Sequence, residues 1–369
     1  MGINGIANIS VYKRLSRTVL DLSKRIDLLQ LLEPVNLIDE KVRFFSGRIH
    51  QPKFEYCAVS YSPEYLDHAL SRLSFPADPI GKLFQARARE VWLNNQIVIN
   101  RGNREKVRDL SVRLYGKPGK SLVKKAISVA VALKKQKGEE NHKQYSSKEV
   151  APAMRRVLTH VGLRSWEVIR TRRQSSSVNV AKKQIKISMQ KHYSRSDIKG
   201  IVVHELFGHV YRAVNGFQQP FGVFATGLPG YLPTEEGLAM YLEEKYGVLD
   251  RASLLRHALK VVAVDSVLKS FCFEACFNRL VELGADEDMA WELTSRVFRG
   301  GGFLKDHVYL QGCYQIKRYV SGGGDIKKLF VGKIGLKDLP LCDDLYRRHL
   351  LKKPTHFPPR KLPEITIKD

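Results

Sequence analysis

The sequence predicts a mainly helical α+β fold with one small antiparallel or mixed sheet. Two observations support this prediction. Apolar residues recur at helical intervals along most of the 369-residue chain, whereas only residues 168–188 alternate between apolar and polar side chains with a period of two. The alternating region leads into a helical segment rich in apolar residues, so the sheet is expected to pack beside that helix.

The N-terminal half is predicted to be helical and basic. Pro34 ends the first helix, since proline cannot continue a helix. Lysines gather on one side of the last helix, and we favour an ordinary solvated face for them over the alternative, a basic docking surface. The predicted helices span residues 9–33, 63–74, 80–98, 103–115 and 120–137.

Residues 138–148 are polar and unpatterned, which is typical of a linker. This linker predicts a division of the chain into a basic helical region at residues 1–145 and a core formed by residues 146–369, on which that region packs. That core is expected to contain a helix at about 148–161 and strands at 168–172, 177–180 and 184–188. Further helices are expected at 250–270, 271–284, 286–298, 306–321 and 336–350, with a glycine loop at 300–302.

The most informative segment is His-Glu-Leu-Phe-Gly-His at residues 204–209. Two imidazoles that flank a carboxylate form the minimal set for binding Zn²⁺ and activating a water molecule. Helical zinc peptidases usually carry these histidines four residues apart. Here they are five apart, which on a regular α-helix would separate them by roughly 140°. The spacing therefore predicts a wide or π-type turn, eased by Gly208, with His204 and His209 as ligands and Glu205 as the general base.

A catalytic zinc ion needs three protein ligands and one open position, so a third ligand is expected downstream. Residues 233–244 read as the start of a helix, with Thr234 as the N-cap and carboxylates in the first turn. We choose Glu236 as the third ligand and one zinc ion per chain as the cofactor. Contact of Glu235 or Glu243 with the metal remains open, and Glu243 could equally lie behind a ligand.

The alternative is a buried cluster of hydrogen-bonded His and Glu side chains that holds no metal. Buried imidazoles and carboxylates without partners would be costly. We favour the metal site because a second helix offers a carboxylate to the histidines. A small sheet beside a metal-binding helix is also the core of zincin folds, so the sequence predicts a zincin-like core whose sheet edge could hold an extended peptide.

The two metal motifs resemble those of the QEGLA-motif family, whose animal members are the microtubule-associated tyrosine carboxypeptidases. The histidine motif is followed by the similar run 227–239, in which Glu235 stands where the family has Gln. Other similar segments are 44–49, 114–118, 298–300 and 305–312. The resemblance implies a zinc carboxypeptidase that acts on an aromatic C-terminal residue, such as the tyrosine of the acidic α-tubulin tail. It implies these site residues: His204, His209 and Glu236 as ligands and Glu205 as the catalytic base.

A carboxypeptidase also needs a cation for the free C-terminal carboxylate and a donor for the oxyanion. Arg299, in the predicted glycine loop, is the first choice for the carboxylate and Lys305 is the second. Both lie in segments that resemble the family. Tyr309 is chosen as the catalytic oxyanion donor. Generic surface charge or aromatic packing is the alternative for these three residues.

The formal net charge of +25 indicates negatively charged partners, such as nucleic acid, an anionic membrane or acidic peptide tails. An acidic C-terminal tail is favoured, with microtubules as the partner if the chain is eukaryotic. No nucleic-acid-binding motif stands out, so a nucleic-acid-binding protein remains an alternative, beside a non-catalytic regulator. Five scattered cysteines, no signal-peptide pattern and no run of about 18 apolar residues predict a cytoplasmic protein without a transmembrane segment.

Overall fold

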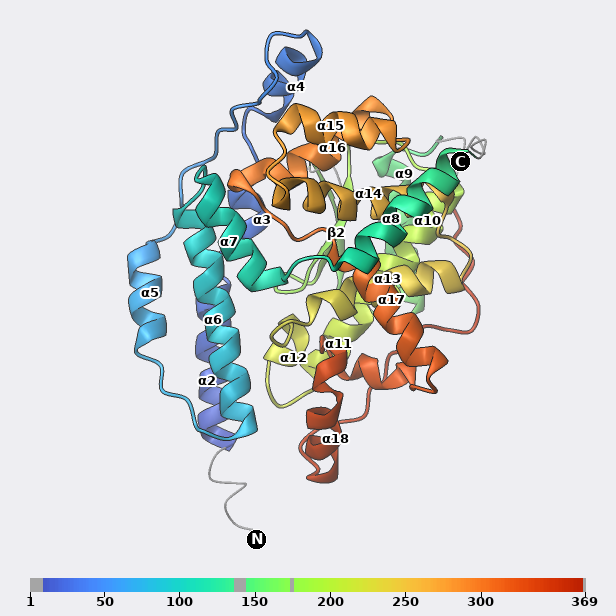
Figure 1. Ribbon diagram of the computed structural model, residues 1–369. Coiled ribbons are helices and arrows are strands. Elements are labelled where there is room, and N and C mark those ends of the chain that lie inside the picture. The colour runs from blue at the N-terminus through green and yellow to red at the C-terminus, as the bar shows by residue number, and fades with distance from the viewer. Residues whose placement is uncertain (1–8, 136–143, 173–175, 368–369) are drawn as a thin grey trace. The chain divides into compact units, whose positions relative to one another are not determined.

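The computed structural model describes residues 9–135, 144–172 and 176–367, and most of them are helical (Figure 1). The chain forms two compact units that alternate along the sequence, Met1–Lys137 with Arg251–Gln311 and Gly138–Asp250 with Gly312–Asp369. The domain division at residues 145 and 146 stays a prediction. The N-terminal residues 1–8, Lys137 and the first part of the expected linker lie outside the described residues.

The first unit is built from helices. Its apolar contacts include a cluster around Val19, Leu66 and Val91 and another around Ile97 and Phe303. Its helices are α2 (Ile9–Ser23), α3 (Leu28–Leu31), α4 (Leu37–Phe45), α5 (Pro63–Ser71), α6 (Pro79–Ile99), α7 (Arg104–Tyr115), α8 (Lys120–Lys134), α14 (Arg251–Leu268), α15 (Phe273–Glu282) and α16 (Glu287–Phe298).

Two N-terminal helices differ from the prediction. The single helix expected at 9–33 is wrong, because the side chain of Asp27 accepts a hydrogen bond from the amide of Gln30 (3.1 Å) and starts α3 as a separate turn. Helix α4 is not foreseen at all. The ring of Phe44 lies 5.0 Å from that of Phe277 and 5.3 Å from that of Trp291, so tertiary packing stabilises this short helix.

A buried ion pair joins α16 to the loop that follows it. Arg296 donates hydrogen bonds of 2.6 and 2.9 Å to the two carboxylate oxygens of Asp306, which is 2% exposed. Burial raises the pKa of Asp306, but the positive charge of Arg296 outweighs it and holds the pKa well below its ordinary value of 3.8. A carboxyl group whose pKa is depressed by folding stabilises the fold above its unfolded-state pKa, and this contribution is lost as the pH falls.

We expect Asp306→Asn to lower the free energy of unfolding by about 3 kcal/mol at neutral pH, because it leaves the Arg296 guanidinium buried without its counter-charge. The difference in the free energy of unfolding between wild type and variant should shrink below about pH 4, because the stabilisation by ionised Asp306 declines there. Urea unfolding across this range measures both effects. Asp21→Asn, which removes an exposed ion pair with Lys24, is the control. A difference that does not change with pH would contradict the ion-pair explanation.

The second unit contains a three-stranded mixed sheet. Strand β3 (Gln184–Ser188) lies in the centre, parallel to β1 (Glu167–Thr171) and antiparallel to β2 (Ser177–Asn179). The predicted small sheet and its three strands are therefore confirmed, in the mixed form.

The sheet packs beside the histidine segment, as predicted. Alternation places Val168 of β1 and Ile185 and Ile187 of β3 in the interior, where each is at most 2% exposed. These side chains belong to the same apolar cluster as Leu206 and Phe207, which lie between the two histidines in the sequence. Burial of this shared surface fixes the position of the histidine segment on the sheet.

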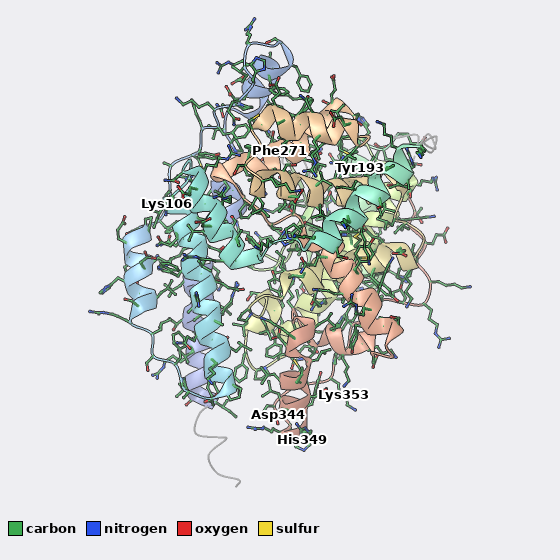
Figure 2. The ribbon with its side chains drawn as sticks, viewed as in Figure 1. Lys106, Tyr193, Phe271, Asp344, His349 and Lys353 are labelled. Atoms are coloured by element: carbon green, nitrogen blue, oxygen red, sulfur yellow. The ribbon has the colours of Figure 1, made fainter. Side chains whose placement is uncertain are left out.

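Helices make up most of the rest of this unit. Tyr193, labelled in Figure 2, is 1% exposed and fixes the link from the sheet to the histidine helix. Its hydroxyl donates to the carbonyl of Ser188 (2.8 Å), and its main chain pairs with Tyr145. The helices are α9 (Ser147–His160), α10 (Arg195–Ile201), α11 (Tyr211–Phe217), α12 (Val223–Thr226), α13 (Leu232–Lys245), α17 (Val308–Ser321, from Gly312 onward) and α18 (Leu339–Arg347).

Two helix boundaries in this unit differ from the prediction. Thr234 is not an N-cap, because α13 begins two residues earlier with Pro233 in its first turn. The hydroxyl of Thr234 instead accepts a hydrogen bond from the amide of Leu336 (2.9 Å). The helix expected at 336–350 begins as a 3₁₀ turn and ends at Arg347.

Among the residues described, none of the helices is both long and apolar enough to cross a membrane.

Candidate metal centre

The two histidines lie on a wide turn inside one continuous helical segment. Helix α10 runs into a π-helix at Val202–Val210, which runs directly into α11. The amide of Tyr211 donates to the carbonyl of Leu206, five residues earlier, which is the hydrogen bond of a π-helix. The predicted wide turn is confirmed. It brings the ring centroids of His204 and His209 to 4.8 Å, at an interplanar angle of 85°.

Glycines allow α13 to lie close to its neighbours. A Cβ atom at Gly208 would lie 2.8 Å from the Cβ atom of Ala239 on α13. A Cβ atom at Gly237 would lie 2.1 Å from the carbonyl carbon of Gly312 on α17. Neither approach is sterically possible. Glycine is therefore required at both positions if α13 is to bring Glu236 up to the histidines.

We expect Gly237→Ala to lower the free energy of unfolding by about 2 kcal/mol or more, since the added methyl group must displace α13 or α17. Zinc affinity should fall as well, because Glu236 is the next residue. Urea unfolding and competition with a chelating dye measure the two effects. The control is Gly200→Ala on α10, where nothing lies within 4 Å of the new atom and stability should be kept or raised. Equal behaviour of the two variants would contradict the close-packing argument.

Three side chains offer their donor atoms to one point. The Nε2 atoms of His204 and His209 each lie 3.6 Å from Oε2 of Glu236, and the three donor atoms are all within 4.8 Å of one another. Ligand atoms around a tetrahedral zinc ion stand about 3.4 Å apart when the bonds are about 2.1 Å long. His209 and Glu236 are at most 8% exposed. The donor set and its spacing therefore fit a zinc ion.

Each histidine is held by a carboxylate at its other ring nitrogen. Nδ1 of His204 lies 3.2 Å from Glu243, and Nδ1 of His209 lies 2.8 Å from Glu235. Such pairs fix the tautomer that leaves Nε2 available to a metal. Glu235 and Glu243, which the sequence left open as further ligands, thus contact the nitrogens opposite to those that face Glu236.

The surrounding carboxylates favour a positive charge at this point. Burial lowers the pKa of His204, but Glu243 and Glu236 outweigh it and raise that pKa well above its ordinary value of 6.5. Glu205 is 7% exposed, and its Oε2 atom is buried with no hydrogen-bond partner among the described residues. A buried acceptor without a partner is costly unless a ligand or water serves it. A metal ion would supply the positive charge, and a water molecule bound to it would give Oε2 of Glu205 a hydrogen-bond partner.

Glu235 belongs to a buried charge cluster. It accepts hydrogen bonds from Arg212 and Lys333, and all three residues are at most 5% exposed. Burial raises the pKa of Glu235, but the positive charges of Lys333 and Arg212, together with His209, lower it to about 2. Glu235 is therefore ionised at neutral pH.

The other predicted site residues belong to the first unit. Arg299 is 6% exposed, its Nη1 atom lies 3.3 Å from Glu33, and burial lowers its pKa. The ring of Tyr309 has the ammonium group of Lys260 at 3.8 Å from its centroid and the ring of His257 at 5.3 Å. Lys305 is half-buried. The roles assigned to Arg299, Lys305 and Tyr309 stay predictions.

The sequence did not identify two residues of the centre, Arg212 and Lys333. The sequence gives only a weak indication that Arg212 belongs to the centre: it is a charged residue within the apolar run Val210–Val214 and lies three positions after His209. It gives no such indication for Lys333, which is 98 residues away from its partner Glu235. Only the fold brings these charges together.

Comparison with known proteins gives one family. Residues 42–364 match the family model described as microtubule-associated tyrosine carboxypeptidase. The mouse protein named "Putative tyrosine carboxypeptidase MATCAP2" is 25% identical over 350 residues, which cover 90% of this chain and 59% of that protein. Its human counterpart of the same name is 34% identical over 175 residues, which cover 43% of this chain and 32% of that protein.

A rat protein, microtubule-associated tyrosine carboxypeptidase 1, is 36% identical over 136 residues, which cover 33% of this chain and 28% of that protein. The matches with these three relatives thus span from 28% to 59% of the relatives' own length. A solved structure titled "putative lipoprotein from Colwellia psychrerythraea" has a TM-score of 0.44 at 14% identity, over 78% of this chain and 62% of that chain. That likeness is too weak to define a fold.

Proposed function

Because this chain belongs to the microtubule-associated tyrosine carboxypeptidase family, a family of metallopeptidases, we propose that it is a zinc-dependent carboxypeptidase. It removes the C-terminal residue, tyrosine, from an acidic peptide or protein tail. The observation that carries the proposal is the convergence of His204, His209 and Glu236 on one point. The buried carboxylate of Glu205 next to His204 adds the base that hydrolysis requires.

The side chains divide the work of hydrolysis. His204 and His209 would hold the metal through Nε2, and Glu236 would hold it through a carboxylate oxygen. When bound, zinc supplies a Lewis acid that polarises the peptide carbonyl and acidifies water. Glu205 takes the proton of the attacking water molecule. It then returns that proton to the amino group of the departing residue, so the carboxylate is regenerated at the end of the cycle.

Arg299 and Lys305 are the residues proposed to recognise the free C-terminus of the substrate. Arg299 is the first choice because its Nε atom is buried without a hydrogen-bond partner among the described residues, which leaves a donor for a carboxylate. A guanidinium group can hold a carboxylate with two parallel hydrogen bonds. Lys305 is the second choice, and Tyr309 is proposed as the donor to the oxyanion.

The proposed substrate is an acidic tail such as that of α-tubulin, and microtubules are the proposed partner. The names of the family and of the relatives point to tyrosine and to microtubules. The net charge of +25 would draw acidic tails to the protein. A tubulin substrate implies action in the cytoplasm, which is the proposed location.

Peptides with a common acidic body test this proposal. The zinc-loaded protein is incubated with peptides that end in Tyr, Phe or Ala, each with a free or an amidated C-terminus, and the released amino acid is measured. Release of tyrosine from the free peptide alone is the expected result. Cleavage of amidated peptides would overturn the carboxypeptidase assignment. No release from any peptide by zinc-loaded protein would overturn the proposed activity.

A further inference from the structure

We propose that Glu235 is a positioning residue of the metal centre, held in place by Arg212 and Lys333, so that the segment 329–334 controls the affinity of a metal bound some 100 residues earlier in the chain. The inference rests on the proposed metal site but not on the peptidase activity. Nothing in the HExxxH pattern itself calls for these three residues.

The carboxylate of Glu235 is fully engaged. Its Oε1 atom contacts Nδ1 of His209 at 2.8 Å and also accepts from Lys333, while its Oε2 atom accepts from Arg212. With both oxygens held by cations, the carboxylate cannot rotate away from the imidazole. The ring of His209 is therefore fixed in the orientation that points Nε2 at Glu236.

The two cations are themselves anchored to the main chain of one segment. Arg212 is fully buried and donates from Nε to the carbonyls of Leu329 (2.9 Å) and Gly332 (3.1 Å) and from Nη2 to that of Ile334 (2.5 Å). Lys333 lies in the same segment, and its amide and carbonyl pair with Phe224 and Leu228. The segment thus supplies one cation and holds the other.

Glu243, the carboxylate that contacts His204, is held less firmly than Glu235. Glu243 lies 3.2 Å from Nδ1 of His204, and its Oε2 atom is buried without a hydrogen-bond partner among the described residues. Only the His209 side therefore combines a short contact with a carboxylate held by two cations. Glu235 is the counter-charge of both buried cations, so its removal leaves Arg212 and Lys333 uncompensated. Removal of Lys333 as well should relieve part of that cost.

The test combines stability with zinc affinity. Glu235→Gln should lower the melting temperature of the metal-free protein by about 5–10 °C, because both buried cations lose their counter-charge. Adding Lys333→Met removes one of these two unpaired cations and should recover part of that loss. Glu235→Gln with Lys333→Met keeps an acceptor for Nδ1 and should bind zinc within a few-fold of wild type. Glu235→Leu with Lys333→Met lacks the acceptor and should bind zinc about 10- to 100-fold more weakly, by competition with a chelating dye.

Glu244→Gln, which changes a residue of the same helix and removes its exposed ion pair with Lys317, is the control and should change neither quantity. Wild-type zinc affinity in the folded Glu235→Leu, Lys333→Met variant would overturn the positioning role. A double Gln and Met variant no more stable than Glu235→Gln alone would overturn the anchoring by cations. Absence of zinc binding by wild type would overturn the metal site and the positioning role together, and the melting temperatures would still decide whether the cations anchor Glu235.

Discussion

Glu205→Gln is expected to lower the rate of tyrosine release by about 10³-fold while zinc remains bound, which is the size of effect that a positioned general base supplies. Gln has the shape of Glu but cannot accept the proton of the attacking water molecule. The Glu205 side chain is 7% exposed, and none of its atoms is in the group of three that converges on the metal point. The variant should therefore lose catalysis without losing the ligands.

The measurement is kcat on the acidic peptide that ends in tyrosine, beside zinc content by elemental analysis. Glu244→Gln on α13 is the matched control, because the same chemical change there affects an exposed pair with Lys317. Retained activity in Glu205→Gln would refute the role of the base. Loss of zinc together with activity would instead make Glu205 a part of the metal-binding set.

His209→Ala is expected to reduce zinc affinity more than about 100-fold, since it removes one of the proposed ligands, and substitutions behind a ligand already cost about 10- to 100-fold. Activity should disappear with the metal, and a strong chelator should reproduce this loss in wild type. Zinc should also raise the melting temperature of wild type but not of the variant, because a ligand stabilises only the state that binds it. His160→Ala, at the exposed end of α9, is the control.

Zinc content after dialysis and the melting temperature with and without zinc provide the readings. A His209→Ala protein that keeps one zinc ion would show that the ion lies elsewhere. A melting temperature of wild type that zinc does not change would argue for the metal-free cluster of His and Glu, which is the alternative that the sequence offered.

The local features of the centre could be predicted because they depend on spacing. Two histidines five positions apart require a wide turn if both face one ion, and the π-helix at Val202–Val210 meets that requirement. The period-two segments likewise become strands, because alternation places Ile185 and Ile187 in the interior. The carboxylates expected in the first turn of α13, together with the resemblance to the QEGLA-motif family, pointed to Glu236, and its carboxylate lies beside both histidines.

The remaining features depend on contacts between distant parts of the chain. The helix that carries Glu236 starts earlier than its cap signal suggests, because Thr234 bonds to the amide of Leu336. Helix α4 forms because Phe44 packs on residues more than two hundred positions away. The partners of Glu235 are of the same kind, since no local pattern links Arg212 to Lys333. Sequence periodicity shows which residues share a face of one helix or strand. The contacts described in this paragraph join residues that are distant in the sequence and close only in the folded protein.

The wide turn has a consequence beyond the two histidines. A straight α-helix advances about 100° for each residue, so one extra residue would rotate everything downstream by that angle. The π-helix at Val202–Val210 takes up the extra residue. Helix α11 therefore continues in the orientation that it would have if the histidines were four residues apart on a regular helix. Arg212 therefore faces Glu235 and the segment 329–334 even though the histidines are five apart. The wide turn thus brings the two histidines together and also keeps Arg212 on the side of the helix that faces Glu235.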